Sequence, residues 1–131
     1  MKAGAEDRQM QLPLPSVLTA RQIEKIVMDW YRNKALACFS ERLALYADKL
    51  GVALPQLRLS HARTQWGSCN SRGIVHLNWR LIQMPLHLVD YVVAHELSHL
   101  IEMNHSPAFW QAVGRVYPNY AEARKELKRF G

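Results

Sequence analysis

Several features that define broad classes of protein are scarce or absent in this sequence. Its 131 residues include only two cysteines, Cys38 and Cys69, which is too few for the disulfide framework of a small secreted domain. No apolar run approaches the roughly 20 residues that a membrane-spanning helix needs. The N-terminal segment, residues 1–15, lacks the apolar core of a signal peptide. We therefore expect a cytoplasmic protein of one domain, with no membrane partner.

The sequence also lacks a glycine-rich phosphate-binding loop and a serine–histidine–acid order, so neither of these two chemistries is indicated. Acidic side chains are in the minority, with 11 Asp and Glu against 17 Lys and Arg, and the formal net charge is +6. One group of basic residues falls in the last predicted helix: Arg124, Lys125, Lys128 and Arg129. Because acidic residues alternate with them, a solvated helix with local ion pairs is favoured over a patch for nucleic acid or another anionic partner.

The segment His95-Glu96-Leu97-Ser98-His99 is the most informative motif in the chain. Two histidines four residues apart lie on one face of an α-helix, so both imidazoles can reach one metal ion. Glu96 is offset around the helix from His95, where its carboxylate can hold a water molecule instead of the metal. The motif lies in an apolar-periodic stretch, residues 86–101, and Pro85 suits the start of that helix. This HExxH pattern predicts a zinc site with Glu96 as the catalytic residue.

His105 is the predicted third metal ligand. It follows His99 by six residues, so the chain has to turn after the helix to bring it to the same metal ion. Three histidines leave one coordination position open, which is typical of catalytic zinc, whereas a structural site has four protein ligands. Glu102 is the alternative third ligand, or else a partner that orients a histidine N–H. Cys69 is a less favoured candidate, and we expect one zinc ion per chain.

A long helix is predicted near the N-terminus. Thr19 and Gln22 are typical of a capping box, and the helix is expected to run to about Lys49, before Gly51. Its expected apolar stripe consists of Ile23, Ile26, Val27, Trp30, Tyr31, Leu43, Leu45 and Tyr46. The residues before it, 1–16, are expected to form a flexible arm, and residues 17–131 the folded domain.

The remaining pattern completes an α+β fold. Short strands are predicted at residues 57–63, 64–68 and 74–79, and we expect them to form a small antiparallel sheet of two or three strands. After the metal-binding helix, Ser106 and Pro107 are typical of the N-cap and first residue of another helix. A last helix is predicted at residues 120–130.

Five segments of the chain carry a resemblance to a known family. They are Trp66-Gly67-Ser68-Cys69, Leu77-Asn78-Trp79-Arg80-Leu81, Asp90-Tyr91-Val92-Val93-Ala94-His95-Glu96-Leu97-Ser98-His99-Leu100, Asn104-His105-Ser106 and Phe109-Trp110. In this combination they resemble the YgjP-like metallopeptidase family, which is similar to the SprT-like and WLM zinc proteases. The resemblance covers nearly everything from about Trp30 to the C-terminus.

The resemblance implies a minimal zincin-like domain, with zinc on His95, His99 and His105 and with Glu96 as the general base. The ligand spacing equals that of metzincins, but Glu102 stands where metzincins have glycine, and only a short tail follows where their methionine turn would come. A full metzincin is therefore not expected. Some members of the YgjP-like group are described as hydrolases of nucleotides such as UTP. The resemblance therefore leaves the substrate open.

Zinc-dependent hydrolysis of a peptide or protein is the favoured function, in which Glu96 takes a proton from water and passes it to the leaving amine. A second electrophile is expected, and the candidates are Tyr91, Arg63 and Arg80. A sheet edge near residues 63–66 can hold an extended peptide as an added strand. Trp66 either lines that cleft or packs in the core. The alternatives are a metal-dependent nucleotide (UTP-type) pyrophosphohydrolase, which the positive charge suits, and a zinc-containing module that binds nucleic acid.

Overall fold

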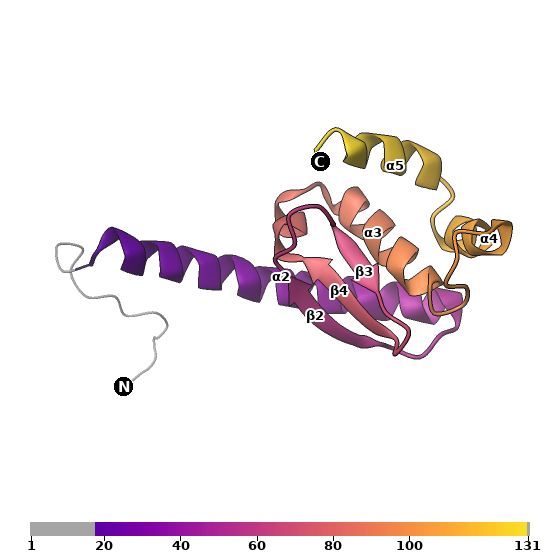
Figure 1. Ribbon diagram of the computed structural model, residues 1–131, viewed down its shortest axis with the longest axis horizontal. Coiled ribbons are helices and arrows are strands. Elements are labelled where there is room, and N and C mark those ends of the chain that lie inside the picture. The colour runs from indigo at the N-terminus through magenta and orange to yellow at the C-terminus, as the bar shows by residue number, and fades with distance from the viewer. Residues whose placement is uncertain (1–17, 131) are drawn as a thin grey trace. The chain divides into compact units, whose positions relative to one another are not determined.

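The computed structural model describes residues 18–130 and has an α+β fold (Figure 1). The predicted arm, residues 1–16, lies outside the described residues. The elements in chain order are α2 (Ala20–Leu50), β2 (Gln56–Ser60), β3 (Gly67–Cys69), β4 (Ile74–Asn78), the 3-10 helix η2 (Trp79–Gln83), α3 (Leu86–Ser98), α4 (Pro107–Val116) and α5 (Tyr120–Lys128). By its contacts the described part of the chain divides into two units at Trp30, residues 18–30 and residues 31–130. Among the described residues, no helix is both long and apolar enough to span a bilayer.

Helix α2 begins with the predicted capping box and ends at a glycine. The Thr19 hydroxyl accepts a hydrogen bond from the Gln22 N–H at 3.1 Å, and the Gln22 side chain accepts one from the Thr19 N–H at 2.8 Å. Gly51 has φ 75°, and the N–H groups of Gly51 and Val52 both bond to the carbonyl of Ala47, which closes the helix. The expected apolar stripe is only partly buried, because the buried residues of α2 begin at Ala35. Leu43 and Tyr46 are buried, whereas Ile23, Val27, Trp30 and Leu45 are exposed.

The three strands form one sheet in the order β2-β4-β3. β3 pairs with β4 antiparallel, as expected, but β2 pairs with β4 in parallel, with Gln56 opposite Ile74 and Ser60 opposite Asn78. The prediction of an entirely antiparallel sheet is therefore wrong. The parallel pairing arises because the loop at residues 61–66 passes the end of β4 and so places β3 on the far side of β4 from β2. A parallel pair needs a crossover connection, and here that connection contains β3 itself.

Asn78, the last residue of β4, holds the loop at this crossing and is fully buried. Its Nδ2 group donates hydrogen bonds to the carbonyls of Ala62 at 2.7 Å and Gln65 at 3.1 Å, and its backbone N–H donates to the carbonyl of Trp66 at 2.8 Å. Its Oδ1 accepts a hydrogen bond from the Arg80 N–H at 3.0 Å. These bonds satisfy a buried amide and join the loop to the end of the sheet.

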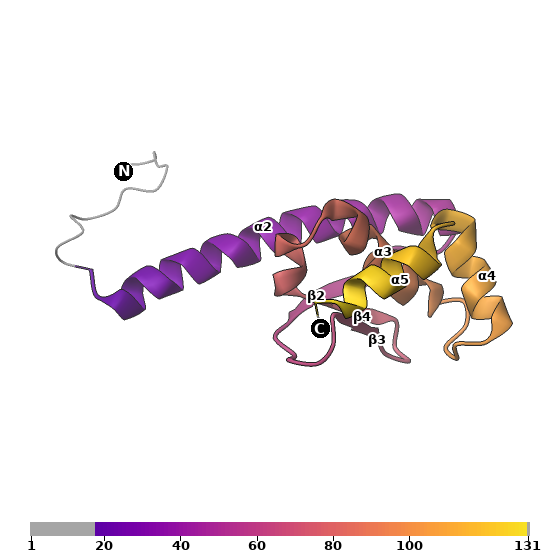
Figure 2. The same cartoon turned by 90° about the horizontal axis from the view of Figure 1, so that it is seen from above.

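Helix α3 is the central element of the core. It contacts β3, β4, η2, α4 and α5, and it lies on the same side of the sheet as the second half of α2 (Figures 1 and 2). Ten of its 13 residues are buried, and two of these are acidic. Asp90 forms an ion pair with Arg42 of α2 at 2.7 Å. The other, Glu96, belongs to the candidate site.

Candidate metal centre and active site

The HExxH motif lies at the C-terminal end of α3. Pro85 precedes the first helical residue, as predicted, but α3 ends at Ser98 instead of residue 101, and His99 is its C-cap. The N–H groups of residues 99–102 bond to carbonyls three or four residues back, so that a tightened turn follows the helix. His105 follows this turn.

The three histidines of the predicted site lie together. One ligand atom from each of His95, His99 and His105 can be chosen so that all lie within 4.8 Å of one another. The Nε2 atoms of His99 and His105 are 3.2 Å apart. Two nitrogen ligands of one tetrahedral zinc ion, with bonds of about 2.0–2.1 Å, would be separated by roughly 3.3 Å. Three imidazoles therefore fit zinc, and they fit it better than magnesium, which prefers oxygen ligands.

Glu102 contacts His99 through its backbone. Its carbonyl oxygen lies 3.2 Å from Nδ1 of His99, so it can accept a hydrogen bond from that nitrogen and leave Nε2 available to a metal. Among residues 18–130, the cluster of candidate ligands includes neither the Glu102 carboxylate nor Cys69. The geometry thus brings His105, and not the alternative ligands, to the first two histidines.

The start of α4 holds His105 in place. Ser106 is the N-cap, with its hydroxyl accepting a hydrogen bond from the Phe109 N–H at 3.4 Å, and Pro107 is the first helical residue, as predicted. Phe109 is fully buried. Its ring centroid lies between 4.5 and 5.0 Å from those of all three histidines. This packing restricts the rotation of the imidazole rings.

Burial also sets the protonation of the histidines. Burial, together with the smaller effects of the nearby His99, His105 and Arg124, lowers the pKa of His95 to about 3. Burial lowers the pKa of His99 as well. Both imidazoles are therefore neutral at neutral pH, which is the form that binds a metal ion.

Glu96 lies beside the histidines with 6% of its surface exposed. Burial raises the pKa of its carboxyl group to about 8. Among the ion pairs of residues 18–130, none involves Glu96. Strand β3 passes close to it, because a Cβ atom on Gly67 would lie 3.1 Å from Cγ and 3.2 Å from Oε2 of Glu96. The carboxyl group lies against the sheet edge and lines the same pocket as His95.

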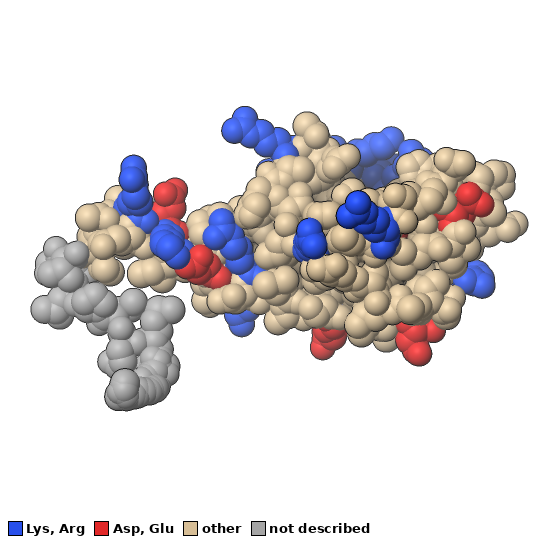
Figure 3. Space-filling view, turned by 60° about the horizontal axis from the view of Figure 1, so that its bottom comes forward, with Lys and Arg blue, Asp and Glu red and all other residues tan. Residues whose placement is uncertain are grey.

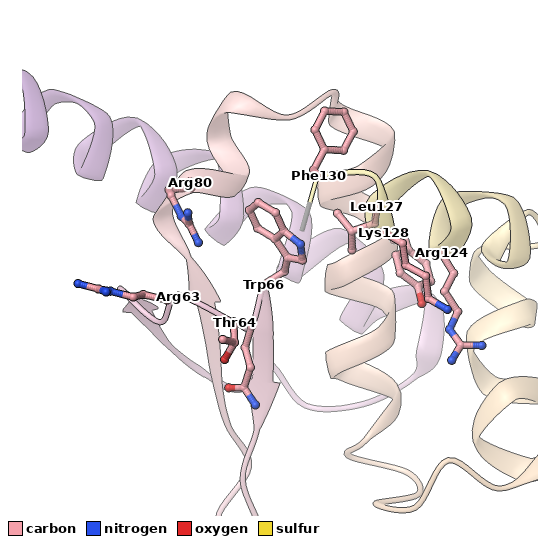
Figure 4. Close-up of a pocket in the computed structure, with 10 residues that line it drawn as sticks. Arg63, Thr64, Trp66, Arg80, Arg124, Leu127, Lys128 and Phe130 are labelled. Carbon is pink, nitrogen blue, oxygen red and sulfur yellow. The ribbon is translucent and has the colours of Figure 1, made fainter.

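The other predicted site residues line two adjoining pockets. The smaller, of about 170 Å³, contains His95 and Glu96, and the larger, of about 370 Å³, is shown in Figure 4. Trp66 and Tyr91 line both pockets. The Tyr91 hydroxyl is 3.4 Å from Nδ1 of His95, and burial raises the pKa of Tyr91 to about 12, so it remains protonated at neutral pH. Arg63 lines only the larger pocket, and its side chain points away from Trp66 in Figure 4.

Sequence reasoning missed three contributors to this region. The sequence gives Phe109 no role beyond its place in a family-like segment, although its position three residues after the N-cap Ser106 turns it toward the turn that carries His105. Gly67 carried no signal beyond its place in a family-like segment. Arg124 was assigned to a solvated helix, whereas it lines the larger pocket.

Comparison with known proteins agrees with this geometry. The family model of the YgjP-like, metallopeptidase domain matches residues 2–130. The metallopeptidase zymogen of Pyrococcus abyssi abylysin shares the fold with a TM-score of 0.63 and 23% identity, over 68% of this chain and 90% of that one. The metallopeptidase zymogen of Methanocaldococcus jannaschii jannalysin does so with a TM-score of 0.61 and 15% identity, over 70% and 94%. The search of curated proteins found no significant sequence match. The match of the family model along nearly the whole chain shows that this protein belongs to the YgjP-like metallopeptidase family.

Proposed function

We propose that the protein is a zinc-dependent peptidase in which His95, His99 and His105 bind one zinc ion and Glu96 is the general base. One observation carries this proposal. Three imidazoles converge within 4.8 Å of one another, and a buried carboxyl group lines the same pocket as one of them. A structural zinc site does not need that carboxyl group, whereas a hydrolytic site does.

A bound zinc ion would act as a Lewis acid and would lower the pKa of a water molecule toward neutrality. Two contacts orient the histidine rings. Nδ1 of His99 contacts the Glu102 carbonyl oxygen, and Nδ1 of His95 lies near the Tyr91 hydroxyl. In this proposal Tyr91 acts mainly by positioning His95, since its hydroxyl contacts that ring.

Glu96 moves the proton in the proposed reaction. A cation close to a carboxyl group favours its ionised form, which opposes the effect of burial on the Glu96 pKa. The ionised carboxylate takes a proton from the attacking water and then delivers it to the nitrogen of the leaving amine as the peptide bond breaks. The pocket beside Glu96 has room for the group that reacts.

Strand β3 is the proposed place for the substrate backbone. It is an edge strand, paired with β4 on one side only, and Gly67 in this strand adjoins Glu96. An extended peptide added to this edge would form main-chain hydrogen bonds, and its carbonyl groups would pass beside Glu96. The predicted edge near residues 63–66 is the loop that leads into this strand.

A nucleic-acid-binding role has less support. In Figure 3, Lys and Arg side chains are spread over the visible face, singly or in small groups, and do not form a continuous stripe. A continuous basic stripe is the expected footprint of a protein that follows a phosphate backbone. The face in Figure 3 shows no such stripe, and the match to a metallopeptidase family supports a peptide or protein as the proposed substrate.

The test is a side-by-side assay of the zinc-loaded protein on unfolded proteins, short peptides and nucleoside triphosphates. We expect hydrolysis of peptide bonds, and a loss of at least about 100-fold in kcat for Glu96→Gln. Cleavage of triphosphates without cleavage of peptides would favour the pyrophosphohydrolase alternative. A fully active Glu96→Gln variant would show that Glu96 is not the general base.

A further inference from the structure

The larger pocket has an unusual charge for a surface that lies beside a hydrolytic site. Four of the residues that line it are cationic, namely Arg63, Arg80, Arg124 and Lys128, and none is acidic. The ion pairs formed within residues 18–130 involve none of these four. Like charges placed close together repel one another and do not stabilise a fold. Their concentration around one hollow therefore indicates an anionic ligand.

Aromatic rings hold two of these cations. The guanidinium of Arg80 lies 5.3 Å from the ring centroid of Trp66, and that of Arg124 lies 5.3 Å from the ring centroid of Trp110. A guanidinium on the face of a ring keeps N–H groups at its edge available for hydrogen bonds, and its planar donors match a carboxylate. Arg80 also donates to the carbonyl of Ala62 at 3.3 Å, which fixes its side chain further.

The larger pocket continues into the pocket that contains Glu96. Trp66, Tyr91 and Leu127 line both of them. Figure 4 shows Trp66 on one side of the larger pocket, and Leu127, Lys128 and Arg124 of α5 on the other. A group bound between them would lie next to the bond that reacts.

We propose that the larger pocket is a specificity site for an acidic side chain, Asp or Glu, close to the bond that a peptide substrate presents to Glu96. The proposal rests on the peptidase function proposed above. The larger pocket, with a volume of about 370 Å³, accommodates one side chain. Trp66 and Leu127 offer apolar contacts to the methylene groups, while Arg124 and Lys128 offer charge to the carboxylate. A peptide is favoured over a nucleotide because residues 63–66, which lead directly into edge strand β3, line the pocket, and an extended backbone can pair with that strand.

The test compares two double charge reversals on α5. Arg124→Glu with Lys128→Glu changes two pocket residues, whereas Lys125→Glu with Arg129→Glu changes two exposed residues of the same helix that do not line the pocket. The two variants have the same net charge and place the same unfavourable charges near a helix C-terminus. Only the pocket variant also loses the contact between Arg124 and Trp110, so thermal unfolding of both variants checks that each is folded. Binding of fluorescent peptides is measured in the full-length, zinc-loaded Glu96→Gln background, with a glutamate-containing peptide and its glutamine counterpart. Hydrolysis of both peptides is measured with Glu96 present.

We expect the glutamate peptide to bind about tenfold more tightly than the glutamine peptide at low salt, with a smaller ratio at high salt. The ratio should fall to about one or below in the pocket variant and persist in the control variant. Equal binding of the two peptides, or an equal loss in both variants, would overturn the proposal. The proposal would also be overturned if a nucleoside triphosphate bound in a way that depends on Arg124 and Lys128 while the protein showed no preference between the two peptides.

The two proposals fail in different ways. Equal hydrolysis of both peptides would overturn the specificity site and leave the peptidase function intact. A charge preference in binding, lost only in the pocket variant, together with no hydrolysis of either peptide, would support the site and contradict the peptidase function.

Discussion

Gly67 lies where strand β3 passes beside Glu96, the proposed general base. A Cβ atom there would lie 3.1 Å from Cγ of Glu96 and 3.1 Å from Cγ1 of Val92. Both neighbours belong to the rigid helix α3, so a methyl group could be accommodated only by displacing the carboxyl group or the strand. The absence of a side chain at this position thus allows Glu96 to lie between the strand and the histidines.

Gly67→Ala is expected to lower kcat by about tenfold or more, because a small displacement of a general base costs much of its effect. Zinc content should stay unchanged, since the histidines are not contacted. Gly114→Ala in α4 is the matched control, because a Cβ atom there would meet its nearest neighbour at an ordinary contact distance of 3.5 Å. This variant should retain activity. Steady-state kinetics and zinc analysis check the prediction, and wild-type kcat in Gly67→Ala would contradict it.

At the scale of elements, the loop at residues 61–66 depends on one buried amide. Asn78 bonds to the carbonyls of Ala62 and Gln65, and the loop leads directly into strand β3. Without that amide, the Gln65 carbonyl would lose this partner, the Ala62 carbonyl would keep only its bond from Arg80, and the buried Asn78 backbone would lose its side-chain link to the loop. Each unsatisfied group costs about 1–3 kcal/mol.

Asn78→Ala is therefore expected to lower the free energy of unfolding by about 3 kcal/mol. Asn33→Ala, at an exposed position of helix α2, should change it by less than about 0.5 kcal/mol. Urea unfolding followed by circular dichroism measures both. Equal stability of the two variants would show that the amide does not hold the loop.

Local signals predicted the element ends well and the strand directions poorly. The capping box at Thr19, the N-cap at Ser106 and the glycine at position 51 act within a few residues, so the sequence alone places them. The parallel pairing of β2 with β4 depends on which side of β4 the loop passes, and no local pattern encodes that choice. The role of Asn78 follows from the loop at residues 61–66 passing the end of β4, so it cannot be inferred from a local sequence pattern.

At the scale of the whole molecule, a partly buried ion pair joins the second half of α2 to α3, the helix that carries the HExxH motif. Arg42 and Asp90 make two hydrogen bonds of 2.7 and 2.8 Å, with 18% and 11% of their side chains exposed. The hydrogen bond to Asp90 raises the pKa of Arg42. Removing the arginine would leave a carboxylate without its partner on a mostly buried helix.

We expect Arg42→Ala to lower the free energy of unfolding by about 3 kcal/mol. Glu41→Ala, which removes an exposed charge 3.9 Å from the same arginine, should change it by less than about 0.5 kcal/mol. Denaturant unfolding of the two variants in the same buffer checks the difference. A stability loss below 1 kcal/mol in Arg42→Ala would contradict the structural role of the pair.

The histidine cluster could be predicted from the sequence because its members are close along the chain. The spacing of four residues places His95 and His99 on one helix face, and the Ser106 cap limits where His105 can lie. The basic pocket could not be predicted in the same way. Arg80 and Arg124 belong to distant segments that only the packing of α5 beside α3 brings together.

The central claim, a catalytic zinc site on three histidines, is tested most directly by the zinc content of the folded protein after removal of metal and reloading. The account predicts about one zinc ion per chain in the wild type and in Glu96→Gln, and weakened binding in His105→Ala. A folded wild-type protein that binds no zinc would contradict the account, as would a His105→Ala variant with wild-type zinc affinity.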